Sequence, residues 1–311
     1  MGSCQRIIEG PPEAVHLLSH YLLILLALLV EFVVASAAPL RTRRWSSDWL
    51  AFARRAGGRL RWWHGWPALI VVVGVPVAGV ALVGSLLGDV AAPLTHVFAL
   101  AVLLLTLGPE DLAEEVAAHQ RMVAAAHASE AAATMPGYLR HALPVELGPL
   151  RGDPEFDETR AEIAQIALAA EYAWFQPLFW FLLFGAPGAV LYRLCANLRR
   201  SHRQDDGLDR PLMTLLEALE YLPARLSVLT FGVAGTLVPV LEELRAVGLT
   251  RWRVSASLVA RCALAAVDHG RIREVISGDS RTYRINQMYG LVRRALVAWV
   301  IVIAGVAIVF D

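Results

Sequence analysis

Apolar residues gather in long runs along this chain, and polar residues fill the stretches between them. The clearest apolar runs are 17–38, 66–87, 93–107 and 291–310. An α-helix rises 1.5 Å per residue, so a run of about 22 residues covers about 33 Å and can cross the hydrocarbon core of a bilayer. No stretch shows the alternation of apolar and polar residues that is typical of a strand. The pattern predicts an all-α integral membrane protein with four transmembrane helices and two further apolar segments of ambiguous type.

The first apolar run has a competing interpretation as a cleaved signal peptide, because Ala35-Ser36-Ala37 resembles a cleavage site. The charges that flank this run argue against cleavage. Arg6 is offset by Glu9 and Glu13 before the run, and the positive residues come after it. We therefore interpret 17–38 as an uncleaved membrane anchor.

Arginines set the expected orientation of the spans. Residues 40–65 contain seven Arg and one Asp, so by the positive-inside rule this loop is cytoplasmic and the N-terminus faces outward. The short link 88–92 makes 66–87 and 93–107 a helical hairpin, which returns the chain to the cytoplasm at residue 108. Arg293 and Arg294 hold the start of the last run inside and leave the C-terminus outside.

The two ambiguous segments lie in the middle of the chain. Run 173–194 is interrupted by Gly185-Ala186-Pro187-Gly188, and run 226–241 covers only about 24 Å as a helix. If both crossed the membrane, the Arg-rich stretch 195–225 would lie outside and violate the positive-inside rule. We therefore favour re-entrant or interfacial segments, for which broken backbone is tolerated where protein covers it.

These spans divide the chain into five regions. Residues 1–107 form an N-terminal membrane region with its Arg-rich loop, and 108–172 form a cytoplasmic helical segment. In that segment we expect one helix over 108–134 and a second through Phe156, Ile163, Ile166 and Ala170. A membrane-associated motif region, 173–241, comes next, followed by a cytoplasmic helical segment, 242–290, and the C-terminal helix, 291–311.

Composition supports the membrane assignment and narrows the chemistry. The chain is 57% hydrophobic and 18% charged, and its 28 basic residues balance 28 acidic ones, so nothing attracts it as a whole to nucleic acid. All 28 basic residues are Arg, which excludes a P-loop lysine and Schiff-base chemistry. The three cysteines are far apart and contain no CxxC pair, so neither a disulfide framework nor a thiolate metal site is indicated.

Three charged residues stand in or beside apolar runs. Glu31 lies deep in the first run, either as a functional carboxylate or as the structural partner of a neighbouring helix. Glu171 opens an aromatic run and either binds a cationic group or marks a helix start at the interface. Arg225 suits bidentate recognition of phosphate or carboxylate, or else snorkels to the interface.

Metal sites are only weakly indicated. His202, Asp205 and Asp206 could hold a metal with hard oxygen ligands, and they equally describe a solvated loop. His16 and His20 are four residues apart on one helix face, but two histidines do not make a site.

An ordered set of motifs resembles the AmpE family. The set comprises Glu171 with Gln176-Pro177-Leu178-Phe179-Trp180, the stretch Phe184–Ala189 through Tyr192-Arg193 to Asn197, and Pro223-Ala224-Arg225-Leu226. The family pattern also matches at Glu31, Gly108–Leu112 and Val292–Ala295. The resemblance implies a bacterial inner-membrane protein that takes part in controlling β-lactamase induction and is linked to peptidoglycan recycling.

The same motifs are more distantly similar to CobD/CbiB, the ATP-dependent membrane synthetases that form an amide during cobalamin assembly. That family has an Asp pair and an Asn before the PARL motif, where this chain has Leu216-Glu217 and Glu220. Its Asn-Thr-x-Asp stretch reads Asn197-Leu198-Arg199-Arg200 here. These departures remove carboxylates that could hold Mg²⁺-ATP, although Glu217, Asp205 or Asp206 could substitute for them.

Three hypotheses follow. The first is an AmpE-type regulatory or sensory protein, the second is an ATP-dependent amide-forming synthetase on a CobD-like scaffold with Mg-ATP as cofactor, and the third is an interaction scaffold. Besides the lipid bilayer, the expected partner is a small anionic or nucleotide ligand. We expect Glu31, Glu171, Asn197 and Arg225 to line one pocket that opens toward the cytoplasm, because unpaired polar groups in apolar surroundings demand partners.

Overall fold

The computed structural model describes residues 12–33, 44–57, 65–107, 116–117, 121, 154–201, 207–247, 255–267 and 280–310. Within these ranges every regular element is helical, which confirms the all-α prediction for the described part of the chain. Three segments there are long and apolar enough to cross a membrane, namely Gly65–Val90, Ile163–Arg199 and Tyr283–Gly305. Shorter apolar helices cover Ser19–Val30, Ala92–Thr106 and Ser255–Val267. The fold is that of an all-helical membrane protein.

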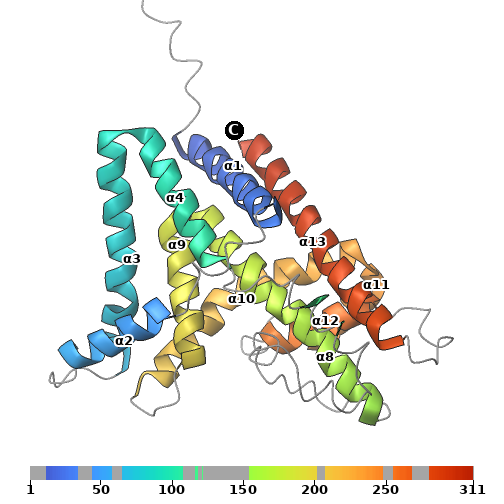
Figure 1. The fold of residues 1–311 in the computed structure, drawn as a ribbon. Coiled ribbons are helices and arrows are strands. Elements are labelled where there is room, and N and C mark those ends of the chain that lie inside the picture. The colour runs from blue at the N-terminus through green and yellow to red at the C-terminus, as the bar shows by residue number, and fades with distance from the viewer. Residues whose placement is uncertain are drawn as a thin grey trace, which may run out of the picture.

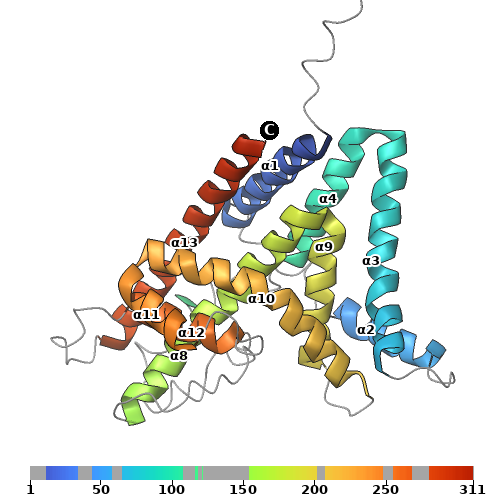
Figure 2. The same cartoon turned by 180° about the vertical axis from the view of Figure 1, so that it is seen from behind.

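The four predicted spans correspond to α1 (Pro12–Val33), α3 (Gly65–Val90), α4 (Ala92–Thr106) and α13 (Ser280–Phe310). Figures 1 and 2 show the N-terminal end of α1, the α3–α4 turn and the C-terminal end of α13 on the same side of the molecule. This arrangement agrees with the crossings expected from the arginine pattern. Which side faces the cytoplasm stays a prediction.

The short helix α2 (Arg44–Gly57) lies across the N-terminal end of α3 (Figure 1). In α3 itself the buried residues are Ala68, Leu69, Val72 and Val73, all in its first turns. Beyond them apolar side chains are exposed, such as Leu82 and Val90, which are 59% and 75% exposed. An apolar surface of this kind on a helix of spanning length is typical of contact with lipid.

Helix α9 (Gln176–Ser201) reverses direction at its sequence GAPG. Gly185 adopts φ 63° and ψ −151°, a conformation that is essentially restricted to glycine. Three residues later, Gly188 packs against the backbone carbonyl of Trp180 so closely that a Cβ atom would overlap it. The two arms of α9 therefore fold back on each other, and the second arm returns alongside the residues that precede the first (Figure 1).

Two polar contacts document the reversal. The Arg193 Nη1 atom of the second arm donates to the carbonyl of Tyr172, 21 residues earlier, at 3.4 Å. His20 Nδ1, on α1, lies 3.1 Å from the carbonyl of Leu182 near the apex. In Figures 1 and 2 the apex stops short of the level of the α3–α4 turn. Ile163–Arg199 is thus not one straight span, and its reversal is the geometry that the predicted re-entrant segment needs.

The second ambiguous run, 226–241, is not a single helix. Helix α10 (Asp209–Ala234) ends at Gly235, and α11 (Leu237–Val247) begins two residues later. Thr236 Oγ1 donates to the carbonyl of Ala266 on α12 (Ser255–Val267) at 2.7 Å, which fixes this turn. Helices α10 to α12 pack with α8 beneath the spanning helices (Figure 2).

The helix expected through Phe156, Ile163, Ile166 and Ala170 is α8 (Pro154–Ala170), and its last turns are deeply buried. It continues into a π-helical stretch, η2 (Glu171–Phe175). Phe175 meets Phe231 of α10 and Trp299 of α13 edge to face, with ring centroids 5.8 and 5.9 Å apart. The helix expected over 108–134 lies almost entirely outside the described residues. The core thus joins η2, α9, α10 and α13 around the buried polar residues described next.

Candidate functional site: a polar cluster between α9 and α10

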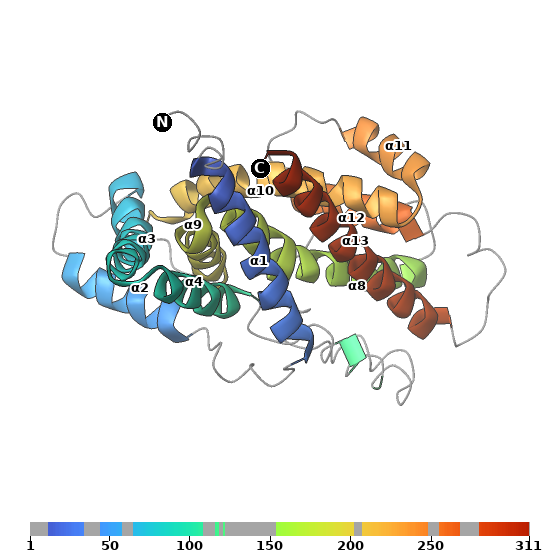
Figure 3. The same cartoon turned by 90° about the horizontal axis from the view of Figure 1, so that it is seen from above.

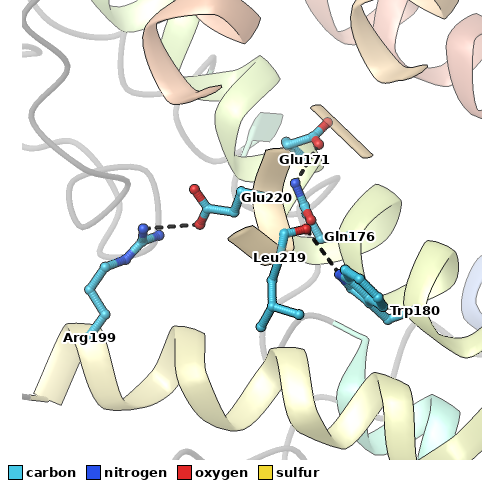
Figure 4. Close-up of polar contacts among 6 residues, drawn as sticks. All are labelled: Glu171, Gln176, Trp180, Arg199, Leu219 and Glu220. Carbon is cyan, nitrogen blue, oxygen red and sulfur yellow. Dashed lines mark hydrogen bonds and ion pairs between the residues drawn. The ribbon is translucent and has the colours of Figure 1, made fainter. Parts of the chain in front are cut away.

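A buried carboxylate begins the π-helical stretch. Glu171 is 2% exposed, and its Oε1 accepts a hydrogen bond from Gln176 Nε2 at 2.8 Å (Figure 4). Ser227 of α10 is a further buried polar group near this carboxylate. Single π-turns inside α-helices occur frequently at functional sites, because the extra residue re-aims side chains. Here the turn directs Glu171 toward α10.

A buried ion pair joins the second arm of α9 to α10. Arg199 Nη1 lies 3.0 Å from Glu220 Oε1, and the two side chains are 9% and 7% exposed (Figure 4). The guanidinium also stands over the ring of Tyr172, 5.1 Å from its centroid. An isolated charge at this depth would be costly, so each of the two residues requires the other.

A second contact binds the two helices beside the ion pair. Trp180 Nε1 donates to the carbonyl of Leu219 at 3.2 Å, as Figure 4 shows. In a regular helix this carbonyl would accept from the N–H of residue 223, which is Pro223 and has none. The indole therefore replaces the hydrogen bond that the proline of the PARL motif removes.

Asn197 lies on the same arm as Arg199 and is 4% exposed. It follows Arg193 by one helical turn and so shares its face, which borders Tyr172. Among the described residues, Asn197 Oδ1, Tyr192 Oη and Arg199 Nε are buried atoms that make no hydrogen bond within the protein. Buried polar atoms of this kind are usually satisfied by ordered water or by a ligand.

Arg225 is buried on α10, where it contacts Tyr221 of its own helix. Its Nη1 donates to the carbonyl of Tyr221 at 2.7 Å, and its guanidinium stacks on the Tyr221 ring at 3.6 Å. Burial lowers the pKa of this guanidinium from its ordinary value. The convergence of Arg225 with Glu171 and Asn197 on one pocket stays a prediction.

The other predicted site residues are only partly described. Glu31 lies in α1, but its side chain is outside the described part, as are His202, Asp205 and Asp206. Glu217 lies half-buried on α10. Within the described ranges, no group of three or more His, Cys, Asp or Glu residues could hold a metal ion.

Sequence reasoning missed the pairing of Arg199 with Glu220 and the bond from Gln176 to Glu171. Two signals were present: Glu220 interrupts an apolar helix face, and Gln176 interrupts an aromatic run. Each demands a partner, but the pattern does not name it. Glu220 meets Arg199 because α10 packs on α9, and Gln176 meets Glu171 across the π-helical stretch.

Comparison with known proteins gives a partial match. Over 92 residues the chain is 39% identical to the cobalamin biosynthesis protein CobD of Chromobacterium violaceum, which is 27% of this chain and 30% of that protein. The chain thus matches less than a third of that protein's length. No family model matches the chain, and no solved structure matches it. The similarity supports the CobD-like part of the resemblance.

Proposed function

We propose that this protein is a regulatory or sensory membrane protein of the AmpE type, built on a scaffold that it shares in part with CobD. In this proposal it binds a small ligand at the polar cluster between α9 and α10. The observation that carries the proposal is the buried ion pair between Arg199 and Glu220. Glu220 stands where the CobD pattern has Asn, and its partner Arg199 stands beside Arg200, which replaces the Asp of the Asn-Thr-x-Asp stretch.

The ion pair argues against the synthetase chemistry. Forming an amide from a carboxylate requires activation by ATP, whose transferred phosphoryl charge is neutralised by Mg²⁺ and cationic side chains. The Glu220 carboxylate is already neutralised by Arg199, and Glu171 Oε1 is bonded to Gln176. The described residues therefore do not fit Mg²⁺-ATP, and we derive no step through it.

The cluster nevertheless suits a small ligand. Arg199 Nε is a donor, Asn197 Oδ1 is an acceptor, and the Tyr192 hydroxyl serves as either. A carboxylate or phosphate would accept from Arg199, whose planar guanidinium favours such groups. This chemistry agrees with the small anionic or nucleotide ligand expected from the sequence, and the AmpE resemblance connects it with β-lactamase induction at the bacterial inner membrane.

The amide-forming synthetase is the second candidate. It is favoured by the partial match to CobD and by Glu171, Asn197 and Arg225, which retain the pattern of that family. Since shared scaffold does not carry function across changed site residues, the two candidates need separate tests.

The regulatory proposal is tested in the native host. Deleting the gene should change β-lactamase induction by a sub-inhibitory β-lactam, and the intact gene should restore it. An Arg199→Gln variant that is present at the same level in the membrane should fail to restore it, whereas Arg245→Gln on the exposed end of α11 should succeed. Unchanged induction after deletion would contradict the proposal.

The synthetase candidate is tested with purified protein in lipid nanodiscs. The protein is incubated with Mg-ATP, a corrinoid acid and aminopropanol phosphate, and the products are analysed by mass spectrometry. We expect no amide product. Detection of the amide would replace the regulatory proposal, and ATP turnover without it would indicate a ligase with another substrate.

A further inference from the structure

Helix α2 lies across the N-terminal end of α3 (Figures 1 and 3). Trp49 Nε1 donates to the carbonyl of Val72 at 2.7 Å, and the Trp49 ring lies 5.7 Å from that of Phe52. Val72 is seven residues into α3, or roughly 10 Å along its axis. Exposed apolar side chains line α3 from Trp66 and Ile70 to Val90, so α2 lies at one end of this apolar surface.

The surface of α2 divides into three faces of different chemistry. Leu50 and Ala53 are buried against the protein, at 5% and 4% exposure. Phe52 is apolar and 58% exposed. Arg54 and Arg55 occupy the last turn, with Arg55 exposed on the side away from the buried face. A helix that only packed on α3 would need only the buried face with Leu50 and Ala53. A helix whose outer surface only contacted water would not expose the apolar ring of Phe52.

We infer that α2 is an interfacial helix that binds the anionic lipid surface of the membrane, with Phe52 among the acyl chains and the exposed Arg55 on the lipid phosphates. Helices that lie in the headgroup layer combine an apolar face with a basic one in this way. The charge is complementary to such a surface, since residues 40–65 carry seven Arg and one Asp. Each basic residue near an anionic leaflet contributes about fivefold to binding.

The first test measures lipid preference on the full chain. Purified protein is titrated with phosphatidylglycerol or phosphatidylcholine, and bound lipid is counted by native mass spectrometry. We expect the wild type to retain phosphatidylglycerol more strongly, and the variant Arg55→Gln to lose about fivefold of that preference. Arg245→Gln, which removes an exposed arginine from α11, should keep it.

The second test reports the depth of each face and does not depend on affinity. Nitroxide labels at positions 52 and 55 are introduced singly in protein whose native cysteines are replaced, and the protein is reconstituted in phosphatidylglycerol-containing nanodiscs. Oxygen should relax the label at 52 more strongly, and a water-soluble nickel chelate should relax the label at 55.

Equal lipid retention in the wild type and Arg55→Gln would overturn the inference, as would a label at 52 that is relaxed mainly by the nickel chelate. Protection of both labels from both reagents would indicate a protein partner on α2 and would likewise overturn it. Neither test depends on the ligand or the regulatory role proposed above.

Discussion

Trp180 completes a helix to which it does not belong. Its indole Nε1 donates at 3.2 Å to the carbonyl of Leu219, the acceptor that Pro223 leaves without a helical N–H. The proline of the PARL motif on α10 thus leaves a carbonyl without its helical donor, and the tryptophan of the aromatic run on the first arm of α9 supplies the replacement donor. This hydrogen bond links the two motifs physically.

We predict that Trp180→Phe destabilises the protein by about 1–3 kcal/mol, because it leaves a largely buried carbonyl unpaired. Pro223→Ala supplies the missing N–H, so adding Trp180→Phe to that variant should cost less. Thermal unfolding of the four proteins in one detergent measures the coupling. Equal costs of Trp180→Phe in both backgrounds would show that the indole acts only through packing.

The reversal in α9 depends on the absence of a side chain at Gly188. A Cβ atom there would overlap the Trp180 carbonyl. Because this carbonyl belongs to the backbone, it cannot move aside as the end of a flexible side chain could. Gly188→Ala should therefore destabilise the protein by about 1–3 kcal/mol or more. Gly79→Ala on α3 is the matched control, since nothing lies within 4 Å of the added atom, and it should be neutral or slightly stabilising. Similar melting temperatures for the two variants would disprove the tight turn.

The buried ion pair should behave unlike an exposed one. Arg199→Leu or Glu220→Leu alone leaves an unpaired buried charge and should cost about 3–5 kcal/mol, whereas the double variant should cost less than either. Arg261 and Glu243 form the comparison pair between α12 and α11, with side chains about one-third exposed. Breaking that pair should cost about 0–1 kcal/mol. Unfolding measured by intrinsic fluorescence tests both pairs, and strictly additive effects of Arg199→Leu and Glu220→Leu would contradict the coupling.

Orientation is testable by cysteine labelling in intact cells. Leu50 is buried and would react poorly on either side, so Arg55, which is exposed, is the better position for the cytoplasmic loop. An impermeant thiol reagent should fail to label Arg55→Cys and should label Asp89→Cys at the α3–α4 turn. The reverse pattern would invert the topology.

Long apolar helices were the part of the fold that the sequence predicted well. The run 66–87 became Gly65–Val90, because lipid tolerates neither polar side chains nor unpaired backbone over a span. Elsewhere hydropathy alone did not predict where the helices begin and end. Helix α13 begins at Ser280, eleven residues before its apolar run, since packing on α8 and α10 supports polar turns there.

The candidate site was less predictable. Glu171 and Asn197 were found because polar residues in apolar runs are conspicuous, and both are buried. The pairing of Arg199 with Glu220 was not found, because it depends on how α10 packs against the second arm of α9, which hydropathy does not reveal. Periodicity also could not reveal that 226–241 breaks at Gly235, since apolar residues continue through the break.

The reversal at Gly185 also constrains the order in which this protein can be assembled. The apolar helix before it, 163–184, runs through η2 and measures about 33 Å, whereas the second arm, 186–201, measures about 24 Å and falls short of a hydrocarbon core of about 30 Å. Set among lipids alone, the apex would expose backbone that no neighbour satisfies. Helices α1, α3 and α4, which contact α9, all precede it in the chain. During synthesis from the N-terminus, the helices that cover the α9 hairpin are therefore made before the hairpin itself. A circularly permuted chain in which α9 is synthesised first should insert into the membrane poorly.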